Sequence, residues 1–390
     1  MIKSFSLCIT EVDDVDDALE QLREQFTFED QLLKNSVAII SCYADFVGSG
    51  VYKAVCDALP CEVAGTTTIA NAVRGGDGDI MLNAMILTSD DVYFSVGLSS
   101  SIECEDETPL REAYEAAAAR LPEKPKLILS FAPLLMNVGG DYFVKAFDAI
   151  SGGIPNFGTM AVDHNEDYRE SAVLCNGEAS PNRYAFILMC GDVNPSYYIT
   201  GMSNEKVFHE KCVVTASSGN QLQTVNNMPV IEYLESLGLE KNEEGTIPGI
   251  NAFPFIVDLN DGMMPYICSL FALTPEGYAV CGGNIPVGAT LSVGAINADY
   301  IISSSKNEIK KAVDTGKHSC MLIYSCIGRY FYLGYDPDSE IEKVFSVLDN
   351  TDITYHFAYS GCEICPVYAQ DGTAKTVNRS HNVTLIVCAF

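Results

Sequence analysis

The feature of this sequence that most restricts its fold is a plan of elements that occurs three times. Each copy predicts a helix, a buried strand, a second helix, a loop with a glycine and a long apolar strand. The first strands are "VAIISC" (37–42), "LILSF" (127–131) and "MLIYSC" (321–326), and the closing runs are "MLNAMILTS", "YAFILMCG" and "VTLIVCAF". Uninterrupted apolar runs are typical of strands covered on both faces. The chain therefore favours layered α/β architecture.

The order strand, helix, strand predicts parallel neighbours joined by a right-handed crossover. Between 253 and 298, short strands separated by Gly, Pro, Asn and Asp predict a meander of antiparallel additions. The expected fold class is α/β, with mixed parallel and antiparallel sheets and outer helices. Two stacked sheets between helix layers are one arrangement that satisfies this pattern.

An internal duplication is indicated by a repeated tripeptide. Ser-Val-Gly occurs at 95–97 and again at 292–294, an offset of 197 residues, and the next helices are predicted to start at Thr108 and near Ser305. A polar segment near 205–225 separates the halves. We therefore expect two domains, 1–205 and 206–390.

The charge of the chain limits the classes of partner. With 23 Lys and Arg against 52 Asp and Glu, the net charge is −29. Such a chain repels nucleic acids and anionic membrane surfaces, so a small molecule or a protein is the expected partner. The N-terminus lacks the pattern of an export signal, and no apolar run is long enough to span a membrane. The fifteen cysteines are then expected to be reduced and mostly buried, in a cytoplasmic protein.

The repeated units predict where a ligand binds. In each unit, the loop after the first strand and the glycine loop after the second strand fall at the carboxyl ends of adjacent parallel strands, where open α/β sheets bind ligands. The glycines there permit close approach of the backbone. The third unit, which contains "SCIGRYFYLG" and "YSGCEI", carries the most chemically active side chains. The candidate ligand-binding residues are Cys326, Arg329, Tyr359, Gly361, Cys362 and Glu363, with Thr66 and Thr67 from the first unit.

Arg329 and Glu363 suggest a zwitterionic ligand. A guanidinium binds a carboxylate and a carboxylate binds an ammonium, so the two side chains facing one pocket suit an amino acid. A structural ion pair between them across the loops explains the same residues equally well.

The pair Cys362-x-x-Cys365 has three interpretations. A structural zinc site needs four ligands and the chain has no second such pair, which makes these two cysteines weak metal candidates. A redox pair usually opens a helix, whereas Pro366 follows here. Thiols that are buried or that line a pocket are the favoured interpretation.

No group of residues requires catalysis, so the protein is not expected to be an enzyme. A Cys nucleophile, Cys326 or Cys362, is the enzymatic alternative. The histidines form no metal-binding spacing, although a single histidine is able to serve as an axial haem ligand.

Several motifs resemble those of FIST domains (F-box and intracellular signal transduction). The N-terminal part is represented by "EVAGTTTIANAVRGGDGDIMLNAMIL" and "IPNFGTMAVDH", and the C-terminal part by "SCIGRYFYLGYDPDSEIEKVF" and "HFAYSGCEICP". Cys326, Arg329, Leu333 and Gly334 match the family pattern. The run Tyr359, Gly361, Glu363 and Ile364 matches with one residue inserted, because Cys362 separates the glycine from the glutamate. The likeness extends over roughly 30–390.

The resemblance implies a bacterial sensory domain that binds small ligands such as amino acids. Some relatives bind haem instead, so a haem- or metal-binding gas or redox sensor is the alternative; no cofactor is expected otherwise. We expect no output module within this sequence, so the expected partner is a separate signalling protein such as a histidine kinase, a chemoreceptor or a cyclic-dinucleotide enzyme. The inserted Cys362 leaves the identity of the ligand open.

Overall fold

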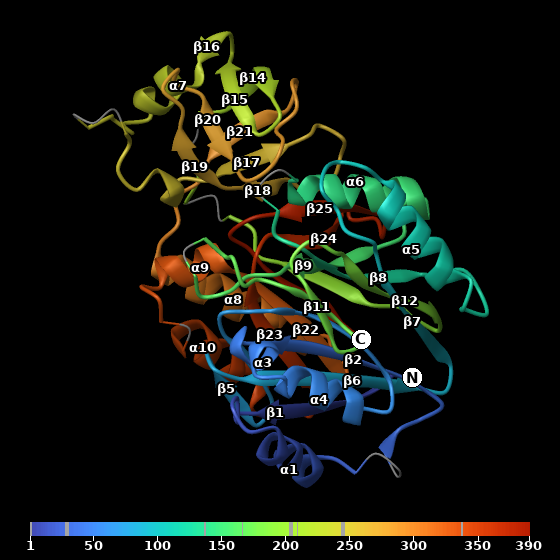
Figure 1. Cartoon of the computed structure of the whole chain (residues 1–390). Helices are drawn as coiled ribbons and strands as arrows, with labels where there is room; N and C mark the ends of the chain where they lie inside the picture. The colour runs from blue at the N-terminus through green and yellow to red at the C-terminus, as the bar shows by residue number, and fades with distance from the viewer. Residues whose placement is uncertain are drawn as a thin grey trace.

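A computed structural model describes residues 2–27, 31–135, 138–165, 167–202, 206–208, 210–242, 246–336 and 338–390. In this part of the chain, three six-stranded sheets form a body, and a smaller β-domain projects from it (Figure 1). The mixed α/β class predicted from the sequence is confirmed. Within the described ranges, no helix is long and apolar enough to cross a membrane.

The body consists of three repeats with the same order of elements. The first repeat comprises β1 (Lys3–Ile9), α1 (Val15–Gln25), β2 (Asn35–Cys42), α3 (Asp45–Gly48), α4 (Val51–Ala58), β3 (Glu62–Thr67), β4 (Asn71–Val73), β5 (Gly76–Gly78) and β6 (Leu82–Ser89). The second comprises β7 (Val92–Leu98), α5 (Thr108–Ala118), β8 (Leu127–Ala132), α6 (Gly140–Ser151), β9 (Asn156–Met160), β10 (Val173–Cys175), β11 (Glu178–Ser180) and β12 (Ala185–Gly191). The third comprises β13 (Ser196–Ile199), α8 (Ala298–Asp314), β22 (Cys320–Cys326), α9 (Ile327–Tyr332), α10 (Asp338–Leu348), β23 (Thr354–Ser360), β24 (Glu363–Tyr368), β25 (Thr376–His381) and β26 (Leu385–Ala389).

The third repeat is interrupted between β13 and α8 by the inserted β-domain. This domain contains β14 (Cys212–Ser218), β15 (Gln221–Val225), β16 (Met228–Pro229), α7 (Val230–Ser236), the short 3-10 helix η2 (Ile250–Ala252), β17 (Phe255–Asp258), β18 (Tyr266–Cys268), β19 (Leu270–Leu273), β20 (Ala279–Cys281) and β21 (Thr290–Val293). Its pairings are antiparallel, and it has its own apolar core. The predicted meander is thus part of this domain.

The three repeats exchange hairpins in a cycle. The strand orders are β1-β6-β2-β3-β10-β11, β7-β12-β8-β9-β24-β25 and β13-β26-β22-β23-β4-β5. The last two strands of each sheet come from another repeat. The second repeat supplies β10 and β11 to the first sheet, and the third repeat supplies β24 and β25 to the second sheet. The first repeat supplies β4 and β5 to the third sheet. In every sheet the two central strands are parallel and the other pairings are antiparallel. Residue 205, where the predicted domain boundary lies, is outside the described residues, and strands are exchanged across it.

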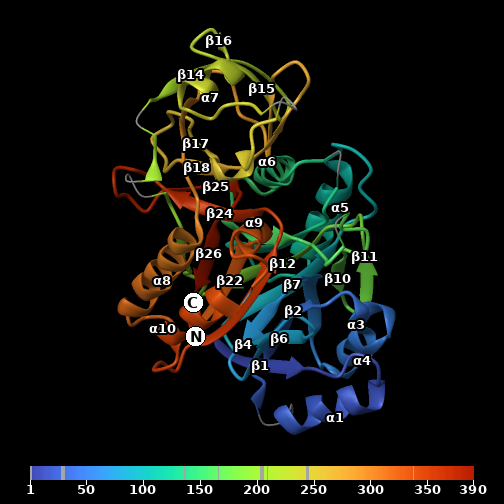
Figure 2. The ribbon, with the colours of Figure 1, turned by 90° about the vertical axis from the view of Figure 1, so that its left-hand side faces the viewer.

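One apolar core lies between the three sheets. Each sheet contributes the inward side chains of alternate positions, such as Ile39, Leu129 and Leu322, to a single cluster. The outer faces are covered by α1 and α4, by α5 and α6, and by α8 and α10 respectively (Figures 1 and 2). The outer helices match the prediction, whereas the number of sheets around the core is three rather than two. This closed arrangement explains why the central strands are apolar on both faces.

The Ser-Val-Gly repeat does not mark equivalent strands. Its first copy lies in β7 of the body, and its second begins in β21 of the inserted β-domain. The counterpart of β7 in the third repeat is β13, and α8 begins at Ala298 rather than near Ser305. Short coincidences of sequence are therefore weaker evidence of repetition here than the order of the elements.

Candidate functional site

The glycine loops of the three repeats meet at one end of the body. The Val162 backbone N–H donates to the Thr67 carbonyl at 3.3 Å, and the Gly361 N–H donates to the Met160 carbonyl at 2.8 Å. The Thr68 hydroxyl hydrogen-bonds to the Tyr359 carbonyl. The ends of β3, β9 and β23 therefore converge, although they belong to different sheets.

Two of the loop glycines allow the central strands to approach closely. A Cβ atom on Gly65 would lie 1.8 Å from the Ile40 carbonyl oxygen, and one on Gly158 would lie 2.0 Å from the Ser130 carbonyl oxygen. No other residue type fits either position without moving the neighbouring strand. The close approach predicted for these glycines is thus present, in the backbone of the body itself.

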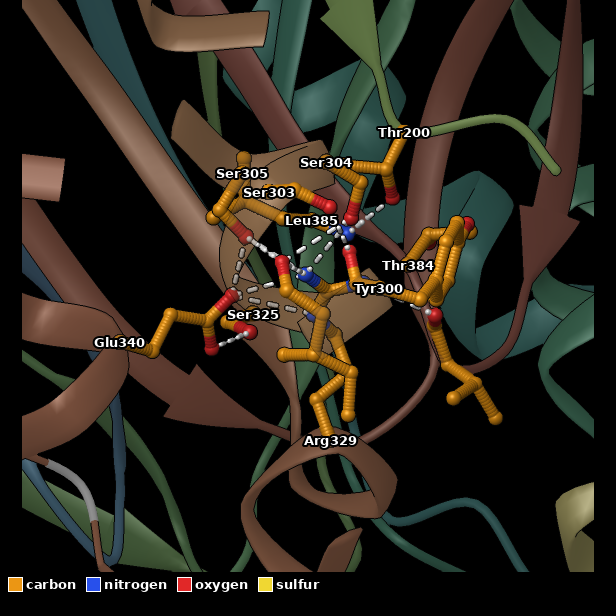
Figure 3. Close-up of polar contacts among 12 residues, drawn as sticks. Thr200, Tyr300, Ser303, Ser304, Ser305, Ser325, Arg329, Glu340, Thr384 and Leu385 are labelled. Atoms are coloured by element: carbon orange, nitrogen blue, oxygen red, sulfur yellow. Dashed lines mark hydrogen bonds and ion pairs between the residues drawn. The ribbon is translucent and has the colours of Figure 1, made fainter. Parts of the chain in front are cut away.

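Arg329 is surrounded at this end by polar groups from several elements (Figure 3). Its side chain is fully buried, and its Nη2 and Nε atoms lie 2.9 Å and 3.1 Å from Glu340 Oε1. The guanidinium also donates to the Ile301 carbonyl at 2.8 Å and to the Ser305 hydroxyl. Burial opposes its charge, but Glu340 supports it, and the net effect is a raised pKa of Arg329.

Glu340 completes this network from the other side. Its Oε2 atom accepts hydrogen bonds from the Ser325 hydroxyl at 2.8 Å and the Tyr359 hydroxyl at 2.6 Å. Sequence reasoning missed this residue. A signal was present, because Glu340 shares one helical face with Val344 and Leu348, four and eight residues further on, and that face is apolar.

The ion-pair partner of Arg329 is therefore Glu340, and not Glu363 as the sequence suggested. Glu363 is also fully buried, and its Oε2 accepts from the Thr384 hydroxyl at 2.9 Å. Its Oε1 has no hydrogen-bond partner among the described residues. Burial, its largest influence, raises the pKa of Glu363 well above the ordinary value. Arg329 and Glu363 thus do not form a pair of exposed charges ready for a zwitterion.

Thr66 and Thr67 lie in the first sheet and line neither of the cavities described below. The Thr67 hydroxyl accepts from the Ala172 N–H at 2.9 Å, which joins β3 to the chain before β10. Thr66 is buried on the opposite side of the same strand, paired with Ser41 of β2. Of the eight candidates, the structure brings Cys326, Gly361 and Cys362 to one cavity, and it places Tyr359 in the network of Arg329.

The first cavity has a volume of about 330 Å³ and lies between the body and the inserted β-domain. Its wall is mainly apolar and contains no charged side chain from the described part of the chain. The inserted β-domain contributes Asn251, Ser269 and Phe271. The body contributes Leu134, Val162, Tyr168, Cys326, Ile327, Gly328, Phe331, Tyr332, Gly361, Cys362, Asn382 and Val383.

The two cysteines at this cavity are held as neutral thiols. Burial, followed by the nearby Glu363 carboxyl, raises the pKa of Cys362 to about 12 and raises that of Cys326 as well. The Asn382 amide donates to the Cys362 sulfur at 2.9 Å. Cys365 is on another side of β24, in the common core, so the two cysteines of the Cys-x-x-Cys pair do not face one site.

Alkylation should therefore be slow at this cavity. At neutral pH, iodoacetamide should modify the exposed Cys104 first and leave Cys326 and Cys362 largely unmodified, because the reactive species is the thiolate. Peptide mapping by mass spectrometry measures each rate, and unfolding in guanidinium should make the rates similar. Rapid, selective modification of Cys326 or Cys362 in the folded protein would support the Cys-nucleophile alternative.

A second cavity, of about 230 Å³, lies between α6, β25 and the inserted β-domain. Unlike the first, it is lined by charges of both signs, from Asp141, Lys145, Asp148 and Arg379. Asp148 is partly buried, which raises its pKa, and its carboxylate accepts from the Asn378 amide at 2.6 Å. The remaining lining residues are Val144, Leu259, Tyr266, Cys268, Gly282, Gly283, Asn284, Pro286, Asn378, Ser380 and Asn382.

The side chains that line these cavities bear on the haem and metal alternatives. Among the described residues, no three His, Cys, Asp or Glu side chains are grouped to hold a metal ion. His356 and His381 are buried inside the protein, and no described histidine lines either cavity. A haem at the first cavity would therefore need a cysteine or tyrosine as its axial ligand, and Cys326, Cys362 and Tyr168 line the wall.

Comparison with known families identifies the chain. The model of the FIST N domain matches residues 36–228, and that of the FIST C domain matches residues 230–366. The protein therefore belongs to the FIST family, as its motifs suggested, and FIST domains are associated with sensing in signal transduction. No curated protein matches the chain in sequence.

Two solved structures resemble the chain weakly. Cyanuric acid hydrolase from A. caulinodans aligns over 100% of this chain and 99% of its own, with 10% identity and a TM-score of 0.33. A second cyanuric acid hydrolase, described as an evolutionary innovation by structural concatenation, aligns over 76% of this chain and 100% of its own, with 10% identity and a TM-score of 0.29. These scores are too low to support an inference about function.

Proposed function

We propose that the protein is a cytoplasmic sensor that binds a small, uncharged and largely apolar molecule in the first cavity. The observation that carries this proposal is the composition of the wall, which is apolar apart from neutral groups such as Asn251, Ser269 and Asn382. Ligand pockets are commonly apolar cavities of a few hundred Å³ with a small number of polar groups that orient the ligand. The position at the carboxyl ends of β22 and β23 agrees with the usual site of ligands in α/β sheets.

An amino acid, the class implied by the family resemblance, is the second candidate. A zwitterion needs partners of both charges, and these line the second cavity rather than the first. Asp141 and Asp148 on α6 suit an ammonium, and Arg379 on β25 suits a carboxylate. Arg379 is already paired with Asp261 and Lys145 with Asp141, so such a ligand has to compete with these contacts.

The sensor acts, in this proposal, on a separate protein rather than by catalysis. The neutral state of Cys326 and Cys362 supports a binding role for these thiols. A histidine kinase, a chemoreceptor or a cyclic-dinucleotide enzyme is the kind of partner expected from a sensory domain.

A thermal-shift screen tests both candidates in one experiment. Indole and other uncharged aromatic compounds should raise the melting temperature through the first cavity, and amino acids should do so only if the second cavity binds them. A ligand at one hundred times its Kd stabilises the folded state by about 2.7 kcal/mol, which is easily detected.

Two matched substitutions assign any ligand to its cavity. Gly328→Leu fills the first cavity and should abolish the effect of aromatic compounds, and Gly283→Leu fills the second and should abolish that of amino acids. Gly48→Leu on α3 is the control, because a Cβ there has no neighbour within 4 Å. If no compound of either class shifts the melting temperature, or if both filled variants respond as the wild type does, the proposal is wrong.

A further inference from the structure

A row of hydrogen bonds joins the inserted β-domain to the body. The Asn382 backbone N–H donates to the Ile267 carbonyl at 3.0 Å, and the Asn382 side-chain oxygen accepts from the Ser269 N–H at 3.1 Å. Further along the row, the Met264 N–H donates to the Tyr368 carbonyl at 3.0 Å. We call the facing segments 261–269 and 368–382 the contact row.

Side chains extend this row but do not widen it. The Gln370 amide donates to the Met263 carbonyl at 2.8 Å, and Arg379 forms an ion pair with Asp261. A small apolar cluster of Met263, Val367 and Ala369 packs beneath these contacts. The polar contacts named here therefore follow one line across the interface.

The two cavities lie on either side of this row. Residues of α9 line the first cavity and residues of α6 line the second, and in Figure 1 these helices are on opposite sides of the place where β18 meets β25. Asn382 lines both cavities, so its side chain forms part of the wall between them. The contact row consequently has a cavity on each flank.

Both cavities also join the inserted β-domain to the body. Ser269 and Phe271 of the inserted β-domain face Cys326 and Val383 of the body across the first, and Gly283 faces Asp141 across the second. The aromatic rings of Phe271 and Phe331 at the first cavity are 56% and 39% exposed. A tilt of the inserted β-domain toward α9 would bury these rings.

We propose that the contact row is a rocker axis, about which the inserted β-domain tilts according to which cavity is filled. This inference rests on the proposed function, since it makes the orientation of the inserted β-domain the signal produced by a bound ligand. When the cavity on one flank is filled, the inserted β-domain and the body are kept apart on that flank and move closer together on the other. Packed interfaces convert small changes at a site into rigid-body movement in this way. Ligands of the two cavities then oppose one another, because each favours a different orientation.

The glycines at the two cavities allow a test that needs no ligand. A Cβ on Gly328 would meet Val383 at 3.4 Å and Cys326 at 3.7 Å, and one on Gly283 would meet Asp141 at 3.8 Å, all ordinary contacts. Neither glycine has a positive φ. Leucine at either position therefore fills its cavity without backbone strain. By contrast, a Cβ on Gly282 would lie 2.3 Å from the Asn382 side chain and would damage the axis itself.

Spin labels placed on exposed helical positions report the tilt. Genetically encoded labels replace Glu232 on α7 of the inserted β-domain, Lys343 on α10 and Glu112 on α5. Double electron–electron resonance then measures the distances from 232 to 343 and from 232 to 112 in the full chain. Gly328→Leu should lengthen the distance from 232 to 343 relative to the distance from 232 to 112. Gly283→Leu should lengthen the distance from 232 to 112 relative to the distance from 232 to 343.

The control and the contradicting outcomes are specific. Gly48→Leu should leave both distances at their wild-type values. If both cavity-filling variants fold and leave the distances unchanged, or shift them in the same direction, the rocker is refuted. Should a leucine variant fail to fold, valine at the same position provides the same comparison. The spin-label experiment uses no ligand, so the two proposals can fail separately. If a ligand binds in the thermal-shift screen but the spin-label distances do not change, only the rocker is refuted. If no ligand binds, only the proposed function is refuted.

Discussion

Glu340→Gln should lower the free energy of unfolding by about 3–5 kcal/mol, because it leaves the charge of Arg329 buried without a counter-charge. Both side chains are fully buried, and their closest oxygen–nitrogen distance is 2.9 Å. Glutamine keeps the shape of the side chain, so the loss reports on the charge more than on packing. Denaturation in urea, followed by circular dichroism, measures the effect.

A double variant separates the charge from its surroundings. Arg329→Met with Glu340→Leu removes both charges and should be more stable than Glu340→Gln, because a buried pair replaced by apolar groups leaves no uncompensated ion. Removing the exposed pair of Lys310 and Asp314, which lie 2.9 Å apart, should change stability by less than about 1 kcal/mol. A Glu340→Gln variant as stable as the wild type would show that Arg329 is not a buried, paired cation in solution.

Acid should destabilise the protein strongly between about pH 6.5 and pH 4. Burial lowers the pKa of His356 from 6.5 to about 4 and that of His381 to about 3, since neither ring is exposed to water. In this pH range the unfolded chain therefore binds more protons than the folded chain, so the free energy of unfolding falls as the pH falls. At pH 4, each histidine should account for a loss of about 3 kcal/mol or more in the free energy of unfolding.

Removing a histidine should flatten this dependence. His356→Gln and His381→Gln cannot take up the proton, so the slope of unfolding free energy against pH should decrease in each variant, whatever its stability at pH 7. Glu363 acts in the opposite sense, because its raised pKa lets the folded state keep a proton, and its contribution declines as the pH rises above 4.5. Unfolding measured in urea from pH 4 to pH 7 gives the slopes. A slope unchanged by both substitutions would mean that each ring has the same pKa in the folded and the unfolded state, which would contradict the lowered pKa values.

The parts of the fold that depend on residues close together in the chain could be predicted from the sequence. The predicted apolar runs lie within the three buried strands β2, β8 and β22, which are each one or two residues longer. The strands β3, β9 and β23 lie beside them in parallel, as the crossovers require. The hairpin exchange was not accessible. A short hairpin such as β4–β5 pairs equally well with its own sheet or another, and only the packing of three sheets around one core selects between them.

One part of the candidate site could likewise be predicted from the sequence, and another part could not. Cys326, Gly361 and Cys362 meet at a cavity because they sit at the ends of adjacent strands, which spacing along the chain predicts. The partner of Arg329 could not be found by its position near a loop, because Glu340 arrives from α10 on the outer face of the sheet. The charged wall of the second cavity joins α6 to β25, more than two hundred residues apart in sequence.

Sequence reasoning correctly predicted the α/β class and the family, and it predicts the end of the strands at which to look for a ligand. These follow from local periodicity and short motifs, which depend on residues close together in the chain. Three properties became visible only in the folded chain: which charges are buried and paired, which sheet each hairpin joins, and the two cavities that flank the contact row. Those properties depend on the distances and the exclusion of water between segments that are remote in sequence, and no local pattern encodes them.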